Sequence, residues 1–133
     1  MPYHRLDVYQ KAYQLALEVH RISLGFPKLE QYGVAQQLRA SSKSIAVNLA
    51  EGMGKQESAA DVKRFVRIAI GSCDETRVWL EFARDLGYLD VLQQNALEER
   101  YQEVGRMLQG LIKHYDGYGG GDSSSFRFLA SSL

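Results

Sequence analysis

Apolar residues recur along this chain at alternating steps of three and four, the spacing that places side chains on one stripe of an α-helix. Four such segments follow one another, at about residues 6–24, 34–51, 58–86 and 89–116. Short connections join them, and no strand-like alternation interrupts the pattern. It therefore predicts an all-α fold, an antiparallel up-down four-helix bundle.

Polar residues and glycines mark where the last two predicted helices begin and end. Ser58 is suited to cap the third helix, with Asp61 in its first turn near the positive end of the helix dipole. Gly87 suits the left-handed conformation that ends a helix. Asp90 and Gln93 have the spacing of a capping box at the start of the fourth helix.

The third segment holds more apolar surface than one bundle core needs. Beside its main seam, a helical projection places Ile68 and Phe82 on one side and Val66, Ile70, Cys73 and Leu80 on the other. The apolar sector spans roughly 240°, against ~100° for a simple surface helix. Two interpretations fit: self-association covers the surplus, or this helix is deeply buried within one subunit.

The stretch SIAVNLAEGMGKQ, residues 44–56, raises the question of a phosphate-binding loop. Such a loop needs G-x-x-x-x-G-K-[ST] after a buried strand, so that successive backbone N–H groups converge on a phosphate. Here Gly54-Lys55 is followed by Gln56, and the preceding segment is helical. Gly52 and Gly54 are instead expected to end the second helix and turn the chain into the third.

Length and composition favour one soluble domain. The chain has 133 residues, of which 45% are hydrophobic and 24% charged, ordinary values for a globular protein. Residues 1–116 form the predicted bundle domain, and the Gly/Ser-rich segment 117–133 is predicted to be a flexible tail that ends in FRFLASSL. We find no signal-peptide pattern and no run of about 18 apolar residues. These features predict a cytoplasmic protein that does not contact a membrane.

Residues suited to catalysis or metal binding do not form a recognisable set. His4, His20 and His114 lie far apart, and no Glu has a His three residues on, as di-iron bundles require. Cys73 lies within an apolar helix, which favours a buried structural thiol over a nucleophile. We therefore expect neither enzymatic activity nor a metal or other cofactor.

Basic residues make a better case for a binding surface. The 16 basic and 16 acidic residues cancel, but residues 39–67 hold six basic residues against three acidic ones, and residues 85–116 hold three against six. A basic patch could follow a nucleic-acid backbone, because phosphate neutralisation supplies much of the affinity for nucleic acid. The alternative is a solvated face with i,i+4 ion pairs such as Arg77–Glu81. The candidate nucleic-acid-binding residues are Arg39, Lys43, Lys55, Lys63, Arg64, Arg67 and Arg77.

About half of the chain resembles a known family. The segments that carry the resemblance are FP and YG before the second helix, QLR and SIAVNLAEG within it, then RFVRIAIGS and LGYL. They resemble the small four-helix-bundle proteins encoded in intervening sequences of bacterial 23S ribosomal RNA genes, relatives of the accessory variability protein of diversity-generating retroelements. The matching motif residues, expected to be structural or to lie between subunits, are Asn48, Glu51, Gly52, Gly71, Ser72 and Glu75.

The resemblance implies both an assembly and a class of partner. It implies a barrel-like homopentamer of closed bundles with basic surfaces, and in the retroelement relatives such an assembly binds nucleic acid and a reverse transcriptase. The chain departs from the family pattern at residues 40–42 and 61–62, which bears more on partner contacts than on the fold.

Two functional hypotheses remain open at this point. The leading one is a non-enzymatic oligomer whose repeated basic patches engage RNA or DNA. The alternative is a protein-interaction scaffold or accessory subunit that binds a protein such as a reverse transcriptase without touching nucleic acid.

Overall fold

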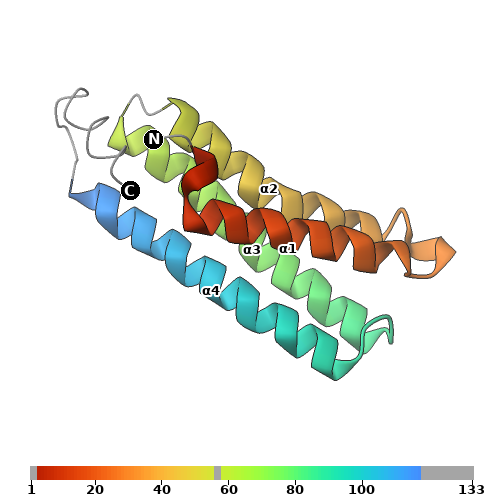
Figure 1. Ribbon diagram of the computed structural model, residues 1–133. Helices are drawn as coiled ribbons and strands as arrows, with labels where there is room; N and C mark the ends of the chain where they lie inside the picture. The colour runs from red at the N-terminus through yellow and green to blue at the C-terminus, as the bar shows by residue number, and fades with distance from the viewer. Residues whose placement is uncertain (1–2, 56–57, 118–133) are drawn as a thin grey trace.

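The computed structural model describes residues 3–55 and 58–117, and these residues form a bundle of four long helices (Figure 1). The helices are α1 (Asp7–Leu24), α2 (Val34–Lys55), α3 (Ala59–Asp85) and α4 (Val91–Asp116), with short 3-10 turns η1 (Tyr3–Arg5) and η2 (Lys28–Glu30). Each helix packs most closely on its neighbours in chain order. The predicted all-α up-down architecture is therefore confirmed. The predicted tail lies outside the described residues, apart from Gly117.

The predicted signals at the helix ends are confirmed for α3 and α4. The Ser58 hydroxyl accepts the backbone N–H of Asp61 at 3.1 Å, and this hydrogen bond caps α3. Asp90 accepts the backbone N–H of Gln93 at 2.7 Å, and the Gln93 side chain accepts the Asp90 N–H at 3.3 Å, completing a capping box. Gly87 has a φ of +82° just beyond α3. Local sequence therefore sets these boundaries.

The expectation that Gly52 and Gly54 end the second helix is wrong, because α2 continues through both glycines to Lys55. A Cβ at position 52 would lie 2.7 Å from the Cβ of Phe65 on α3, whereas one at position 54 would meet nothing within 4 Å. Gly52 therefore allows the two helices to approach closely. Packing between α2 and α3 outweighs the cost of about 1 kcal/mol that a helical glycine carries.

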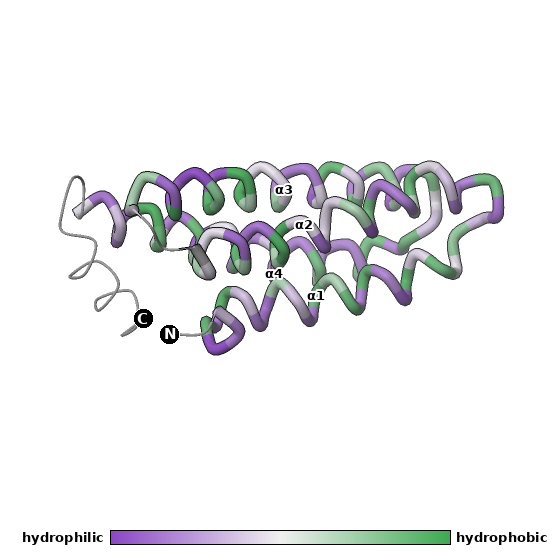
Figure 2. Tube along the Cα trace, turned by 90° about the horizontal axis from the view of Figure 1, so that it is seen from above, coloured by the Kyte–Doolittle hydropathy of each residue, from purple (hydrophilic) through white to green (hydrophobic). Residues whose placement is uncertain are grey.

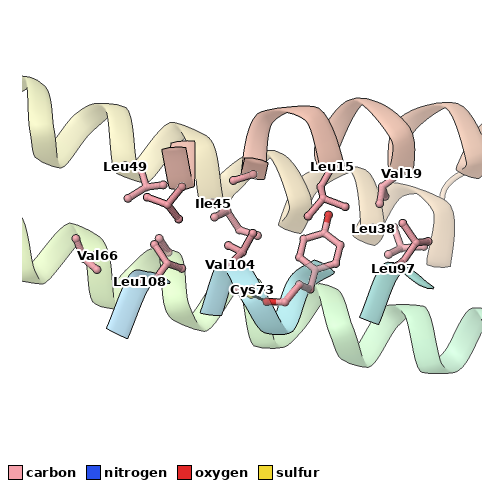
Figure 3. Close-up of a cluster of buried hydrophobic side chains, with 14 of the residues drawn as sticks. Leu15, Val19, Leu38, Ile45, Leu49, Val66, Cys73, Leu97, Val104 and Leu108 are labelled. Atoms are coloured by element: carbon pink, nitrogen blue, oxygen red, sulfur yellow. Dashed lines mark hydrogen bonds between the residues drawn. The ribbon is translucent and has the colours of Figure 1, made fainter. Parts of the chain in front are cut away.

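The core fills the space between all four helices with aliphatic side chains and two buried tyrosines, Tyr101 and Tyr115. Figure 3 shows Leu15, Ile45 and Val104 converging from α1, α2 and α4. Cys73 of α3 is buried in this core, as predicted, and its thiol donates to the Tyr101 carbonyl at 3.4 Å. Figure 2 shows hydrophobic and hydrophilic residues interspersed along the helices, as expected for helices with one face in the core.

Contact between α2 and α3 is the most extensive in the bundle, and hydroxyl groups line it. Thr76 donates to the Ser41 hydroxyl at 2.9 Å, and the hydroxyls of Ser44 and Ser72 lie 2.8 Å apart. Small side chains let the backbones of α2 and α3 approach, and these four hydroxyl groups satisfy one another's hydrogen bonds, as burial of polar groups requires. By contrast, α1 and α4 make little contact and are joined by the ion pairs Lys11–Glu103 and Glu18–Arg100.

None of the described helices combines the length and apolar content needed to cross a membrane.

Candidate nucleic-acid interface

The six predicted cations whose side chains the structure describes do not gather on one surface of the bundle. Arg39 and Lys43 contact residues of α1, whereas Lys63 and Arg77 contact carboxylates of α4. Arg67 is exposed on α3, and Arg64 lies over the Phe65 ring. The Lys55 side chain is outside the described part of the structure. The single patch expected from sequence is therefore divided, and each part has its own contacts.

Arg39 stabilises the connection between α1 and α2. Its guanidinium donates to the Ser23 hydroxyl at 2.8 Å, to the Gln31 side-chain oxygen at 3.2 Å and to the Gln31 carbonyl at 2.8 Å. Gln31 in turn donates to the backbone carbonyls of Ser23 and Phe26, both at 3.0 Å. With these donors engaged inside the chain, Arg39 has a structural role in this connection.

Lys43 is exposed and pairs with a histidine. Its ammonium donates to Nδ1 of His20 at 3.0 Å. Burial and the nearby cations Lys43 and Arg39 lower the pKa of His20, so the imidazole stays neutral and accepts this hydrogen bond. The pair adds one positive charge to the α1–α2 side.

Three of the predicted cations line or flank a groove between α3 and α4, which we call the α3–α4 groove. Its floor and walls enclose about 480 Å³ and contain two glycines and several polar side chains. The lining residues are Ile70, Asp74, Arg77, Gln102, Gly105, Arg106, Gln109, Gly110 and Lys113. Arg67, exposed and one turn before Ile70, extends the basic edge along α3.

Arg106 and Lys113 of α4 were not predicted as site residues. They lie seven residues apart, so they share one face of α4, and both are exposed. The acidic majority in residues 85–116 concealed them, because a sum over a helix does not distinguish its faces. The sequence signal that could have found them is the seven-residue spacing of Arg106 and Lys113, with Gly105 and Gly110 on the same helix.

Ion pairs neutralise some cations of the groove and leave others uncompensated. Arg77 donates to one Glu98 oxygen from two nitrogens, at 2.9 and 2.6 Å, and its guanidinium lies 3.7 Å from Asp74. This pairing replaces the expected Arg77–Glu81 contact. Lys63 is bound to Asp116 of α4 at 3.0 Å.

Arg67, Arg106 and Lys113 have no ion pair or hydrogen bond to another described side chain. The lining of the groove thus presents two available positive charges, Arg106 and Lys113, beside the exposed carboxylate of Asp74, and Arg67 adds a third positive charge one turn before Ile70 on α3.

The side of α3 next to α2 differs from this groove in character. We call it the outer α2–α3 face, and it consists of Arg64, Ile68, Gly71, Glu75, Trp79 and Phe82 on α3. Trp79 packs on Phe82 with ring centroids 5.5 Å apart, and its indole N–H donates to Glu75 at 3.3 Å. Arg64 lies over the Phe65 ring, 4.4 Å from its centre.

The family motif residues cluster at this face and at the contact beneath it. Asn48 donates to the carbonyl and hydroxyl of Ser44, at 2.8 and 3.0 Å, and Ser44 contacts Ser72. Gly52 lies against Phe65, while a Cβ on Gly71 would meet nothing within 4 Å. Glu51, at the exposed edge of α2, is engaged in an interaction of its own.

The surplus apolar surface predicted on the third helix is buried on one side of the helix and exposed on the other. Val66, Cys73 and Leu80 are buried within the subunit, whereas Ile68 and Phe82 remain about half exposed. Deep burial therefore accounts for one side of the helix. The other side stays uncovered in a single chain.

Among the described residues, no three His, Cys, Asp or Glu side chains come together as a metal site. Burial raises the pKa of the Cys73 thiol to about 11, which keeps it protonated near neutral pH.

Comparison with known proteins places this arrangement in a family. A family model described as "23S rRNA-intervening sequence protein" matches residues 4–110. The chain belongs to the 23S rRNA-intervening sequence protein family. A crystal structure from Bacteroides thetaiotaomicron, described as a protein of unknown function from the S23 ribosomal protein family, has the same fold. Its TM-score is 0.74 at 22% identity, covering 85% of this chain and 99% of that one. A search of curated proteins finds no match.

The resemblance seen in the sequence is thereby confirmed. For the 23S rRNA-intervening sequence protein family, the matched range begins before α1 and ends in the last turns of α4, so it includes both the outer α2–α3 face and nearly all of the α3–α4 groove.

Proposed function

We propose that this chain is a non-enzymatic, self-assembling protein that binds the phosphate backbone of nucleic acid, RNA in particular, through the α3–α4 groove. The observation that carries the proposal is the pair of cations Arg106 and Lys113, which line a polar groove without an ion pair to a described residue, with the exposed Arg67 one turn before Ile70 of the same lining. Gln102 and Gln109 add neutral hydrogen-bond donors beside them. A phosphate backbone is recognised by such a mixture of cationic and amide groups.

Self-association would place several grooves on one assembly, which matters because a single groove binds nucleic acid weakly. Three cations release few counterions, so a single groove gives modest affinity at physiological salt. The outer α2–α3 face, with Ile68 and Phe82 half exposed on one helix, is the surface we assign to contact between copies. A homopentamer, as the family resemblance implies, would present five grooves and bind one strand with high avidity.

Charge reversal in the groove tests the proposal. The variant Arg106→Glu/Lys113→Glu is expected to lose binding to single-stranded RNA at least about tenfold, measured by fluorescence anisotropy over a range of salt concentrations. The slope of log affinity against log salt should fall by roughly two in magnitude per groove, because two phosphate contacts are lost. Both side chains are exposed, so the fold should be retained.

The matched control is Arg5→Glu/Arg21→Glu, which makes the same change of net charge on exposed residues of η1 and α1. It should keep most of the affinity. Equal losses in both variants would indicate a general charge effect and contradict a site in the groove. No retention of RNA or DNA by the wild type at low salt would leave the protein-scaffold alternative.

A further inference from the structure

The end of the bundle that carries the α1–α2 and α3–α4 connections displays an unusual number of exposed apolar side chains. Figure 1 shows both connections at this end, opposite the end of α4. Leu29 is 81% exposed, Tyr32 89% and Leu92 81%. Leu24, Leu86 and Val91 are each more than half exposed nearby. We call these six residues the loop-end patch.

The two connections that form the loop-end patch are held together as one surface. The ring of Phe26 lies 5.5 Å from that of Tyr88, and the Tyr88 hydroxyl donates to Glu30 at 2.6 Å. Arg39 and Gln31 hold the α1–α2 connection from beneath. The patch is therefore ordered before any partner arrives, which lowers the entropy cost of binding.

Charges divide the loop-end patch into two halves of opposite sign. Residues 21–33 contain Arg21 and Lys28 against Glu30, a balance of two basic to one acidic residue. Residues 81–93 contain three acidic residues against Arg84. Leu24, Leu29 and Tyr32 lie in the basic half, and Leu86, Val91 and Leu92 in the acidic half.

We infer that the loop-end patch binds the same patch of a second copy, end to end, about a two-fold axis. A two-fold contact sets each surface against itself, and with the axis along the boundary between the halves the basic half of one chain meets the acidic half of the other. Each chain then covers apolar area on the order of several hundred Å², and a patch of this size on a monomer marks an interaction site. The self-complementary charges favour a second copy over an unrelated protein.

This contact is separate from the outer α2–α3 face, which runs along the bundle rather than across its end. It is therefore tested in a Phe82→Glu background, in which side-by-side association through that face is disrupted. Light scattering at high micromolar concentration is expected to give a mass of twice the 15.0 kDa chain. Adding Leu29→Glu/Leu92→Glu should reduce the mass to that of one chain, with unchanged circular dichroism because both leucines are exposed.

Tyr13→Glu, a substitution of an exposed apolar residue on α1 away from the patch, is the matched control and should keep the doubled mass. Asp85 is already paired with Arg84 of its own chain at 2.8 Å, so the charge arrangement is tested by Lys28→Glu and Glu81→Lys, each expected to weaken the contact about tenfold. The two changes together should restore it.

A single-chain mass in the Phe82→Glu background would overturn the inference. So would a Tyr13→Glu control whose mass falls as far as that of Leu29→Glu/Leu92→Glu. Failure of the charge-swapped pair to recover would contradict the two-fold geometry. Neither result depends on whether the protein binds nucleic acid.

Discussion

The two exposed sides of α3 lie on one helix yet differ in almost every physical property. The outer α2–α3 face has Ile68, Trp79 and Phe82 with the uncrowded Gly71 among them. The side facing α4 has the ion-paired Lys63 and Arg77, and Arg67 is exposed one turn after Lys63. A single 27-residue helix therefore separates an apolar surface from a charged one.

The difference suggests a division of labour within a single helix. Apolar area is stabilised by removal from water and favours contact between protein surfaces. Uncompensated cations remain hydrated and favour contact with phosphate. The outer α2–α3 face and the α3–α4 groove lie on different sides of α3. A copy bound at the outer α2–α3 face would therefore leave the groove open.

The largest effect is expected from charges placed on the outer α2–α3 face. Ile68→Glu/Phe82→Glu should weaken self-association by about 100-fold or more, because it buries two carboxylates in a contact between copies. The free energy of unfolding of the single chain should change little, since both residues are about half exposed. Sedimentation velocity measures the first quantity and urea titration at low concentration the second. A variant that still forms species larger than the end-to-end dimer would show that this face is not the contact.

A pair of glycine substitutions should separate the contact inside the chain from the proposed contact outside it. Gly52→Val is expected to destabilise the chain by about 1–3 kcal/mol, since its Cβ would lie 2.7 Å from that of Phe65. Gly71→Ala should stabilise the isolated chain by up to ~1 kcal/mol, because a Cβ there meets nothing within 4 Å and alanine favours a helix. Chemical denaturation of both variants gives these values.

The outcome for Gly71→Ala also bears on assembly. If a second copy packs closely at this position, the substitution should weaken self-association while stabilising the chain. An increase in both quantities would place Gly71 outside the contact.

The smallest effect concerns the α4 side of α3, where Cys73 lies beneath the groove. Burial raises the pKa of its thiol from 9.0 to about 11, so between these values the folded chain holds a proton that the unfolded chain has released. Stability from this group is therefore complete below about pH 9 and is lost as pH rises to about 11. The free energy of unfolding of Cys73→Ala should fall less steeply over this range than that of the wild type. Parallel pH profiles would show that the thiol titrates alike in both states.

Much of the fold could be predicted from the sequence because periodicity and capping act locally. The three-four spacing located all four helices, and Ser58, Gly87 and Asp90 marked the boundaries of the last two. The end of α2 was missed for a reason that is not local. Glycines normally stop a helix, but Gly52 lies where α3 approaches, and this tertiary contact carries α2 onward.

The candidate site was less predictable, because charge in a sequence has no direction across a bundle. In the sequence Arg39 looks like any surface cation, and only the folded chain reveals its hydrogen bonds to Ser23 and Gln31. Arg106 and Lys113 were hidden in an acidic segment, and they become neighbours of Arg77 once α4 packs on α3. Which face a side chain joins depends on helix packing, and sequence periodicity alone does not supply that rotation.

The enclosed position of Cys73 has a consequence for how copies of this chain hold together. It is the single cysteine of the sequence, and its sulfur is buried and bonded to the Tyr101 carbonyl. While the bundle is folded, this sulfur does not meet the cysteine of another copy, so no covalent bridge locks an assembly in place. The assemblies proposed above would then form and exchange by reversible contacts alone, with the same equilibrium in reducing and oxidising surroundings.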